Sequence, residues 1–175
     1  ANSVVDIQAI KDTISLPIIG IIKQEYSDSD IFITPTLKEV RAVCATGVEI
    51  VAMDATVRKR PNDEKLDEIV SIIRDEYPDV LLMADSASLA DVAYAEELGF
   101  DFIGTTLYGY TEDTKGENIA DNDFKHLKDV LNQTKLPVIV EGKIDTPQKA
   151  RRAIELGGYS VVCCGAITRP QEITK

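Results

Sequence analysis

Six short apolar runs, separated by segments with helical periodicity, constrain the fold of this chain more than any other feature. Each run is four to six residues long and almost continuously apolar, which is typical of a strand buried on both faces of a parallel sheet. The predicted strands begin near residues 18, 49, 80, 101, 138 and 160. The sequence therefore predicts an α/β fold, in which helices cover a parallel sheet.

Capping and termination signals mark the segments between these runs. Three of them begin with a capping residue and end at a glycine, at residues 36–47, 88–99 and 146–157. Apolar residues at three- and four-residue spacing predict further helices over residues 4–14, 63–77 and 123–133. Because no linker or low-complexity segment interrupts this pattern, residues 1–175 are expected to form a single domain.

Two architectures accommodate a steady alternation of strand and helix, a doubly wound open sheet and a (β/α)₈ barrel. The sequence contains neither the glycine motif that is usual after the first strand of a dinucleotide-binding sheet nor a P-loop. It also contains no stretch of about 18 apolar residues that could span a membrane.

Composition excludes several classes of function. The chain has 19 basic and 30 acidic residues, a net charge of −11, and this acidic balance argues against nucleic acid as a partner. A single histidine, His126, excludes a metal site built from several histidines. Three cysteines, two of them adjacent, suit neither a disulfide framework nor a four-cysteine zinc site. No metal is therefore expected.

The residues that end the apolar runs are the candidates for an active site, because parallel α/β folds place their sites at the carboxyl ends of the strands. Four of the six ends carry an ionisable side chain, at Lys23, Asp54, Asp85 and Glu141. A charge at a strand end is costly unless it has a partner or a task. Asp54 is expected to have a structural role, whereas for Asp85 a functional role and a capping role both remain open.

Lys23 and Glu141 follow runs that lie on opposite sides of the sheet if it closes into a barrel. A lysine and a glutamate that face each other across a pocket suit proton transfer at the two faces of one carbon atom. The alternative is a structural ion pair that caps the barrel.

The turn after the last run is the best candidate for an anion site. Gly165 and Ala166 let backbone N–H groups approach an anion, and Arg169 adds a guanidinium donor. Gly142 is expected to supply the other half of this phosphate site, since barrels often bind phosphate after the seventh and eighth strands.

Other conspicuous residues are expected to be structural. Cys163 and Cys164 fit core packing and a thiol at the solvent edge, and His126 lies on a polar helix as a surface residue. The polar stretch over residues 109–123 is either a solvated loop or a lid over the strand ends.

The strand ends and their neighbours also form a recognisable set of motifs, at residues 16–23, 31–34, 54–56, 83–85, 103–111, 141–142, 146–147 and 165–170. In this order, and over the whole chain, they resemble the N-acetylmannosamine-6-phosphate 2-epimerase family. The Ile-Gly-Thr-Thr-Leu block that begins at residue 103 and the Gly-Ala-Ile-Thr-Arg block that begins at residue 165 are the most specific.

The resemblance implies a (β/α)₈ barrel that interconverts N-acetyl-D-mannosamine 6-phosphate and N-acetyl-D-glucosamine 6-phosphate in sialic-acid catabolism. It implies an enzyme without metal or organic cofactor, whose partner is this small amino-sugar phosphate, and it allows a homodimer. A cytoplasmic location is expected from the three cysteines, which fit reduced thiols. Carried over by position, it implies an acid/base pair, a carboxylate and an arginine that bind the sugar, and three phosphate-binding residues: Lys23 and Glu141; Asp85 and Arg169; Gly142, Gly165 and Ala166.

The same resemblance implies two further strands before residue 1, so that this chain would hold six of the eight strands and lack the first two. Unpaired sheet edges expose apolar surface. The chain alone is therefore expected to be a weakly stable fragment with weak activity. Two other functions remain open: another phosphate-binding barrel isomerase that acts on a sugar phosphate, and a phosphosugar-binding fragment without catalytic activity.

Overall fold

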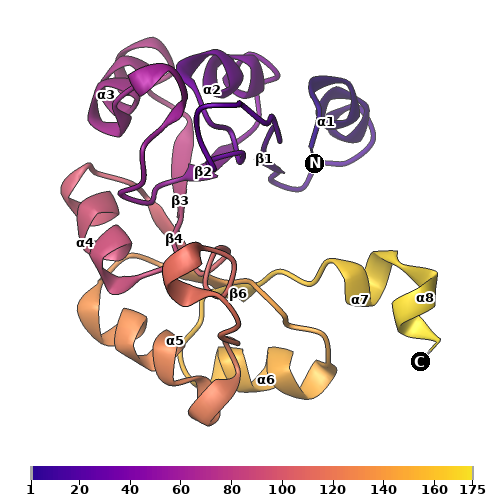
Figure 1. Cartoon of the computed structure of the whole chain (residues 1–175). Coiled ribbons are helices and arrows are strands. Elements are labelled where there is room, and N and C mark those ends of the chain that lie inside the picture. Colours follow the sequence, from indigo (N-terminus) through magenta and orange to yellow (C-terminus); the bar gives the residue numbers. More distant parts are fainter. Residues whose placement is uncertain (1, 175) are drawn as a thin grey trace.

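The computed structural model describes residues 2–174 and shows the expected alternation of strands and helices (Figure 1). Six parallel strands form one sheet in the order of the sequence: β1 (Ile19–Gly20), β2 (Ile50–Asp54), β3 (Leu81–Asp85), β4 (Phe102–Gly104), β5 (Val138–Val140) and β6 (Ser160–Val161). Each strand begins within one residue of its predicted position. The predicted α/β fold is confirmed.

The six predicted helices are present: α1 (Val4–Lys11), α2 (Leu37–Cys44), α3 (Leu66–Glu76), α4 (Leu89–Glu97), α5 (Asp121–Gln133) and α6 (Pro147–Glu155). Two short helices that the sequence did not predict, α7 (Gly165–Thr168) and α8 (Pro170–Ile173), follow β6, and there are 3₁₀ turns η1 (Pro61–Asp63) and η2 (Glu112–Thr114). Ser88 and Thr146 cap α4 and α6 by accepting backbone N–H groups. Thr36 precedes α2 as expected, but its hydroxyl donates to the carboxylate of Glu39.

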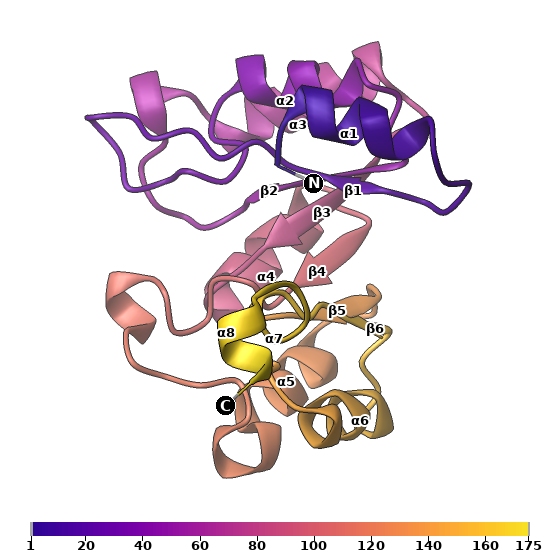
Figure 2. The same ribbon diagram turned by 90° about the vertical axis from the view of Figure 1, so that its right-hand side faces the viewer.

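The sheet curls into half a barrel, with helices on its outer side (Figures 1 and 2). Residues that face outward pack against these helices in the main core, as Val51, Leu82 and Val140 do. Residues that alternate with them face inward and form a second cluster around Ala52, Met83 and Ile139. The runs are mostly apolar because the middle strands β2–β5 are buried on both faces over most of their length.

The two-residue period of a strand carries the inner face onto the residues that follow it. Along each strand, every second residue after a member of the inner cluster also faces inward, and at the carboxyl ends these residues are polar: Lys23, Asp54, Asp85, Thr106 and Glu141. The strand register places Asp54 beside Asp85, and Asp85 beside Gly104. The fold thus collects the ionisable strand-end residues on the inner side of one edge of the sheet.

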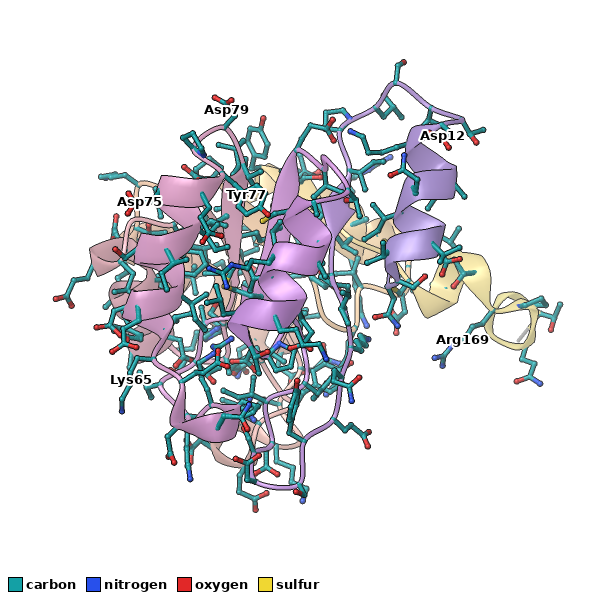
Figure 3. All side chains as sticks on the ribbon, turned by 90° about the horizontal axis from the view of Figure 1, so that it is seen from above. Asp12, Lys65, Asp75, Tyr77, Asp79 and Arg169 are labelled. Atoms are coloured by element: carbon teal, nitrogen blue, oxygen red, sulfur yellow. The ribbon has the colours of Figure 1, made fainter. Side chains whose placement is uncertain are left out.

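The last segment leaves the sheet beyond β6, where α7 and α8 lie apart from the outer helix layer (Figure 1). Arg169 lies between α7 and α8, and from above it is seen on the side of the molecule remote from Lys65 and Asp75 (Figure 3). In the part of the chain from residue 2 to residue 174, no helix is both long and apolar enough to cross a membrane.

Candidate active site

Two carboxyl groups and a hydroxyl form the centre of the candidate site. Asp85 ends β3 and is 3% exposed. The hydroxyl of Thr106, two residues beyond β4, donates to Asp85 Oδ1 at 2.5 Å. The same hydroxyl lies 3.5 Å from Oε2 of Glu141, which directly follows β5. Thr106 therefore stands between the carboxyl groups of Asp85 and Glu141.

The surroundings make both carboxyl groups weaker acids. Burial raises the pKa of Asp85 well above its ordinary value, and the charges of Glu141 and Asp54 raise it further, against the hydrogen bond from Thr106 and the charge of Lys23. Burial also raises the pKa of Glu141, while Lys23 and Thr106 oppose this shift. Carboxyl groups with raised pKa values can hold or release a proton nearer neutral pH, as general acids and bases must.

The backbone of Glu141 is held by the neighbouring strand. The hydroxyl of Thr105 donates to the carbonyl of Glu141 at 2.7 Å and accepts its N–H at 3.0 Å. Gly104 completes this segment, because a Cβ there would lie 3.0 Å from both Asp85 Oδ1 and Thr106 Oγ1. The glycine leaves the space in which these two oxygen atoms meet.

Lys23 lies three residues beyond β1 and is exposed. Its N–H donates to Asn2 Oδ1 at 2.8 Å, and it pairs with Ile33 in an antiparallel bridge. Its ammonium lies 5.9 Å from the ring centroid of Phe32, and its charge lowers the pKa of both Asp85 and Glu141. The structure therefore brings Lys23, Asp85 and Glu141 into one electrostatic cluster.

Asp54 is fully buried and its carboxylate is bound within its own turn. It accepts the N–H and the hydroxyl of Thr56 at 3.0 and 2.7 Å and forms an ion pair with Arg58 at 2.6 Å. This arrangement agrees with the structural role expected for Asp54. A second arginine that the sequence did not single out, Arg60, is 3% exposed and donates to three backbone carbonyls around the end of β2.

The predicted phosphate-binding residues lie at two places. Gly142 follows Glu141 with a φ of +97°, in the region that favours glycine. Gly165 and Ala166 form the first turn of α7, and Arg169 is exposed at its end. The first N–H groups of a helix have no partner within it, so those of Gly165 and Ala166 are directed away from the helix body.

The prediction that His126 is a surface residue is wrong. Its ring stacks on Tyr108 with the centroids 3.8 Å apart and the planes 5° from parallel, and burial lowers the pKa of the imidazole. Within residues 2–174 its Nε2 is buried without a hydrogen-bond partner. The flanking lysines and aspartate on α5 suggested solvent, but the helix turns this one side chain towards the loop after β4.

The other structural expectations agree with the fold. Cys163 packs against the core and Cys164 is exposed, while burial raises the pKa of Cys44 to about 11. The polar stretch after β4 is fastened at its middle, since Lys143 Nζ donates to the carbonyl of Glu117 at 2.5 Å and Ile119 is buried. Whether it acts as a lid stays a prediction.

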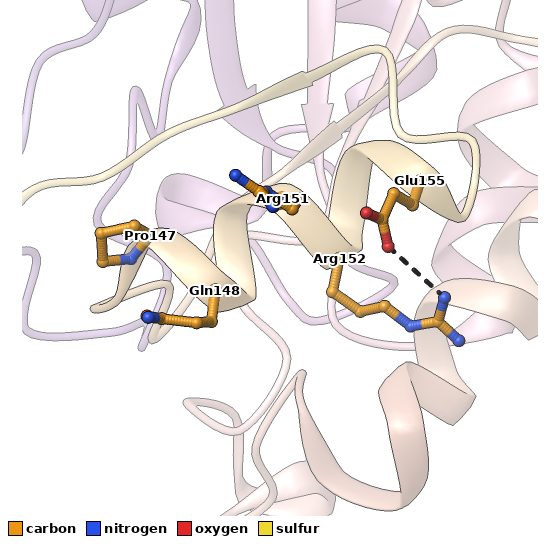
Figure 4. Close-up of a pocket in the computed structure, with 5 residues that line it drawn as sticks. All are labelled: Pro147, Gln148, Arg151, Arg152 and Glu155. Carbon is orange, nitrogen blue, oxygen red and sulfur yellow. Dashed lines mark ion pairs between the residues drawn. The ribbon is translucent and has the colours of Figure 1, made fainter.

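A hollow of about 350 Å³ lies elsewhere, on the outer surface of α6 (Figure 4). Its lining comes entirely from one helix: Pro147, Gln148, Arg151, Arg152 and Glu155. None of the predicted site residues lines it. Across residues 2–174 no group of three histidine, cysteine or acidic side chains is arranged to hold a metal ion.

Comparisons with known proteins agree on one family. A family model described as "Putative N-acetylmannosamine-6-phosphate epimerase" matches residues 1–175. A Listeria monocytogenes protein named as a putative N-acetylmannosamine-6-phosphate 2-epimerase is 66% identical over 174 residues, which are 99% of this chain and 73% of that protein. A Latilactobacillus sakei protein of the same name is 61% identical over 100% of this chain and 76% of its own length.

A solved structure supports the same relationship. The N-acetylmannosamine-6-phosphate 2-epimerase from Clostridium perfringens superposes with a TM-score of 0.92 at 48% identity, covering 100% of this chain and 75% of that one. A thiamine phosphate pyrophosphorylase from Pyrococcus furiosus, at a TM-score of 0.55 and 18% identity, shares the fold alone.

Proposed function

We infer, because this chain belongs to the N-acetylmannosamine-6-phosphate 2-epimerase family, that it interconverts N-acetyl-D-mannosamine 6-phosphate and N-acetyl-D-glucosamine 6-phosphate. The protein is accordingly an isomerase of amino-sugar phosphates, with a role in sialic-acid catabolism. The observation that carries the assignment of its site is the cluster of Lys23, Asp85 and Glu141 at the inner edge of the sheet. The family fixes the reaction, and the cluster suggests which residues perform it.

The two sugar phosphates differ only in configuration at C2. In the open-chain form, the neighbouring carbonyl makes the C2 proton acidic, so a base can remove it on one face and an acid can return a proton on the other. We assign these roles to Lys23 and Glu141. Their strands, β1 and β5, are separated by three others in the curled sheet, which supports an approach to C2 from two sides.

Substrate binding is assigned to the remaining predicted residues. Asp85 is proposed to contact a sugar hydroxyl, because it lies on the inner face beside Glu141. Gly142, together with the free N–H groups of Gly165 and Ala166, is proposed to hold the phosphate, and Arg169 to bind the substrate as a charged donor.

We also propose that β1–β6 are six strands of a (β/α)₈ barrel, numbered three to eight in the complete fold, and that residues 1–175 belong to one domain. The parallel order, the curl of the sheet and the 73–76% of the relatives' length that the chain spans support this proposal. The homodimer and the cytoplasmic location stay predictions.

Proton NMR in D₂O tests the function and the acid/base pair together. Wild-type protein should convert N-acetylmannosamine 6-phosphate to the gluco epimer with deuterium at C2. Lys23→Ala and Glu141→Gln should each lower the rate of C2 exchange by at least about 100-fold, the range expected for a general acid or base. Lys125→Ala and Asp129→Asn are matched controls, since these two side chains form a surface ion pair on the outer helix α5 at 2.5 Å.

The outcomes separate the alternatives. Absence of C2 exchange with either sugar phosphate would contradict the function. Thermal stabilisation by the sugar phosphate without exchange would instead indicate a binding protein. Exchange that survives in both site variants would refute the assignment of Lys23 and Glu141 while leaving the family reaction in place.

A further inference from the structure

We propose that Thr106 is a positioning residue that couples Asp85 and Glu141 into one acid–base unit and relays a proton between them. This inference rests on the proposed function, because it concerns how the proton supply of that same site is maintained. In the sequence, Thr106 is part of the Ile-Gly-Thr-Thr-Leu block that begins at residue 103, and neither its type nor its spacing assigned it a role of its own.

The geometry around the hydroxyl carries the proposal. Thr106 Oγ1 lies 2.5 Å from Asp85 Oδ1 and 3.5 Å from Glu141 Oε2. A hydroxyl has one proton to donate and two lone pairs that accept, so it can bond both carboxyl groups at once if one of them is protonated. The shorter distance is that of a strong charge-assisted bond, and a shift of about 0.5 Å would bring the longer one into the normal range.

Three consecutive residues serve this contact. Gly104 leaves room, because a Cβ would lie 3.0 Å from both oxygen atoms of the Asp85–Thr106 bond. Thr105 holds the backbone of Glu141 with one donated and one accepted hydrogen bond. Thr106 then supplies the bridging hydroxyl. The loop after β4 therefore fixes the position of both partners and of the group between them.

The charges that face this unit favour a single shared proton. Asp54 from β2 and Glu141 from β5 add negative charge around buried Asp85, whereas Lys23, beyond β1, supplies the opposing positive charge. Two neighbouring carboxylates in a buried place cannot both ionise cheaply, so they titrate as a pair. A pair that holds one proton needs a path between its members, and Thr106 occupies that position.

The relay conserves protons and uses no other reactant. When Asp85 is the acid and Glu141 the carboxylate, Asp85 gives its proton to Thr106 Oγ1 while Thr106 gives its own to Glu141. Asp85 is then the carboxylate, Glu141 is the acid, and the hydroxyl is unchanged. The reverse transfer follows when Glu141 takes a proton from C2.

The test compares Thr106→Val, which removes the hydroxyl at nearly constant shape, with Thr106→Ser, which keeps it. Because the hydroxyl lowers the pKa of both carboxyl groups, its loss should move the acidic limb of the pH profile of kcat/KM to higher pH by about one unit. We expect kcat to fall about 10- to 100-fold in Thr106→Val and to recover in Thr106→Ser. Thr134→Val, which removes a buried hydroxyl bonded to Glu96 at 3.2 Å outside this unit, is the matched control and should leave the pH profile unchanged.

An unshifted limb in Thr106→Val, or no recovery in Thr106→Ser, would overturn the proposal. Carbon-13 NMR titration of the wild-type carboxyl groups without substrate gives an independent test that needs no variant. Asp85 and Glu141 should each show both steps of a shared titration, and independent single steps would refute the coupling. If Asp85 and Glu141 titrate as a coupled pair but the protein does not exchange the C2 proton, the proposed function is contradicted and the coupling of the two carboxyl groups still holds.

Discussion

Gly104 offers the sharpest test of how the site is packed. Its φ is not in the left-handed region, so replacement by alanine adds one methyl group without backbone strain. That Cβ would come within 3.0 Å of Asp85 Oδ1 and of Thr106 Oγ1, and nearer still to the terminal methyl group of Met83. The methionine end is flexible and can move, whereas the two oxygen atoms are bonded to each other.

The expected cost follows from these contacts. Alanine restricts the unfolded chain, which stabilises by about 0.4–1 kcal/mol. Overpacking of a buried site costs about 1–3 kcal/mol, and weakening a charge-assisted hydrogen bond costs about 1.5–3 kcal/mol. Together these contributions give a net loss of about 1.5–5.5 kcal/mol, and at about 2–4 °C per kcal/mol for a chain of this size the Tm should fall by about 3–22 °C.

Calorimetry and the C2 exchange rate should be measured on the same samples of Gly104→Ala. The exchange rate should fall at least about tenfold, because Asp85 and Thr106 are displaced by a few tenths of an ångström. Gly116→Ala is the control: it has a φ of +90° and open space around it, so it should lose stability through strain alone and keep its exchange rate. An unchanged Tm and rate in Gly104→Ala, or an equal loss of activity in Gly116→Ala, would refute this reasoning.

Three further predictions concern buried polar groups. Asp85→Asn should abolish C2 exchange yet raise the Tm at pH 7. Burial raises the pKa of Asp85 in the folded state, so the wild-type protein loses stability as the pH rises towards and through that pKa, whereas the variant does not. The difference between the Tm of the variant and that of the wild type should therefore widen from about pH 4 upward. A constant gap would contradict this. Arg60→Leu should lower the free energy of unfolding in urea by about 3–5 kcal/mol, because three backbone carbonyls lose their buried donor; a loss below 1 kcal/mol would show that water replaces it. Burial lowers the pKa of His126, so wild-type stability should fall as pH drops below about 6.5 and His126→Phe should lessen that fall; parallel Tm curves would exclude the histidine.

The sequence predicted the sheet well because the middle strands β2–β5 are buried on both faces over most of their length. A segment such as residues 82–84 must then be apolar at every position, and such runs are easily recognised between polar helices. The ionisable ends were equally visible, since Asp85 and Glu141 interrupt these runs abruptly. That they share the inner face also follows from the two-residue period, once the structure shows which residues of each strand face inward.

Contacts between distant segments could not be predicted in the same way. Thr106 and Asp85 are 21 residues apart, and nothing in either segment shows that one hydroxyl would reach both carboxyl groups. In the sequence, Arg60 is one more basic residue in a polar loop, whereas in the structure its guanidinium is buried among backbone carbonyls. His126 was misplaced because its neighbours along α5 are charged, whereas its partner Tyr108 comes from another element.

The site also gathers buried acidic groups at one edge of the sheet. Each outward-facing strand residue lies in an apolar core, but the inward positions at the carboxyl edge carry Asp54, Asp85 and Glu141. Asp54 is paired with Arg58 within its own turn, although its charge still contributes to the raised pKa of Asp85. Asp85 and Glu141 have only a hydroxyl between them and the charge of Lys23 nearby, so their raised pKa values persist. A carboxyl group that is costly to ionise in the folded protein exchanges protons nearer to neutral pH than an ordinary carboxyl group does, and this suits the proposed proton transfer at C2.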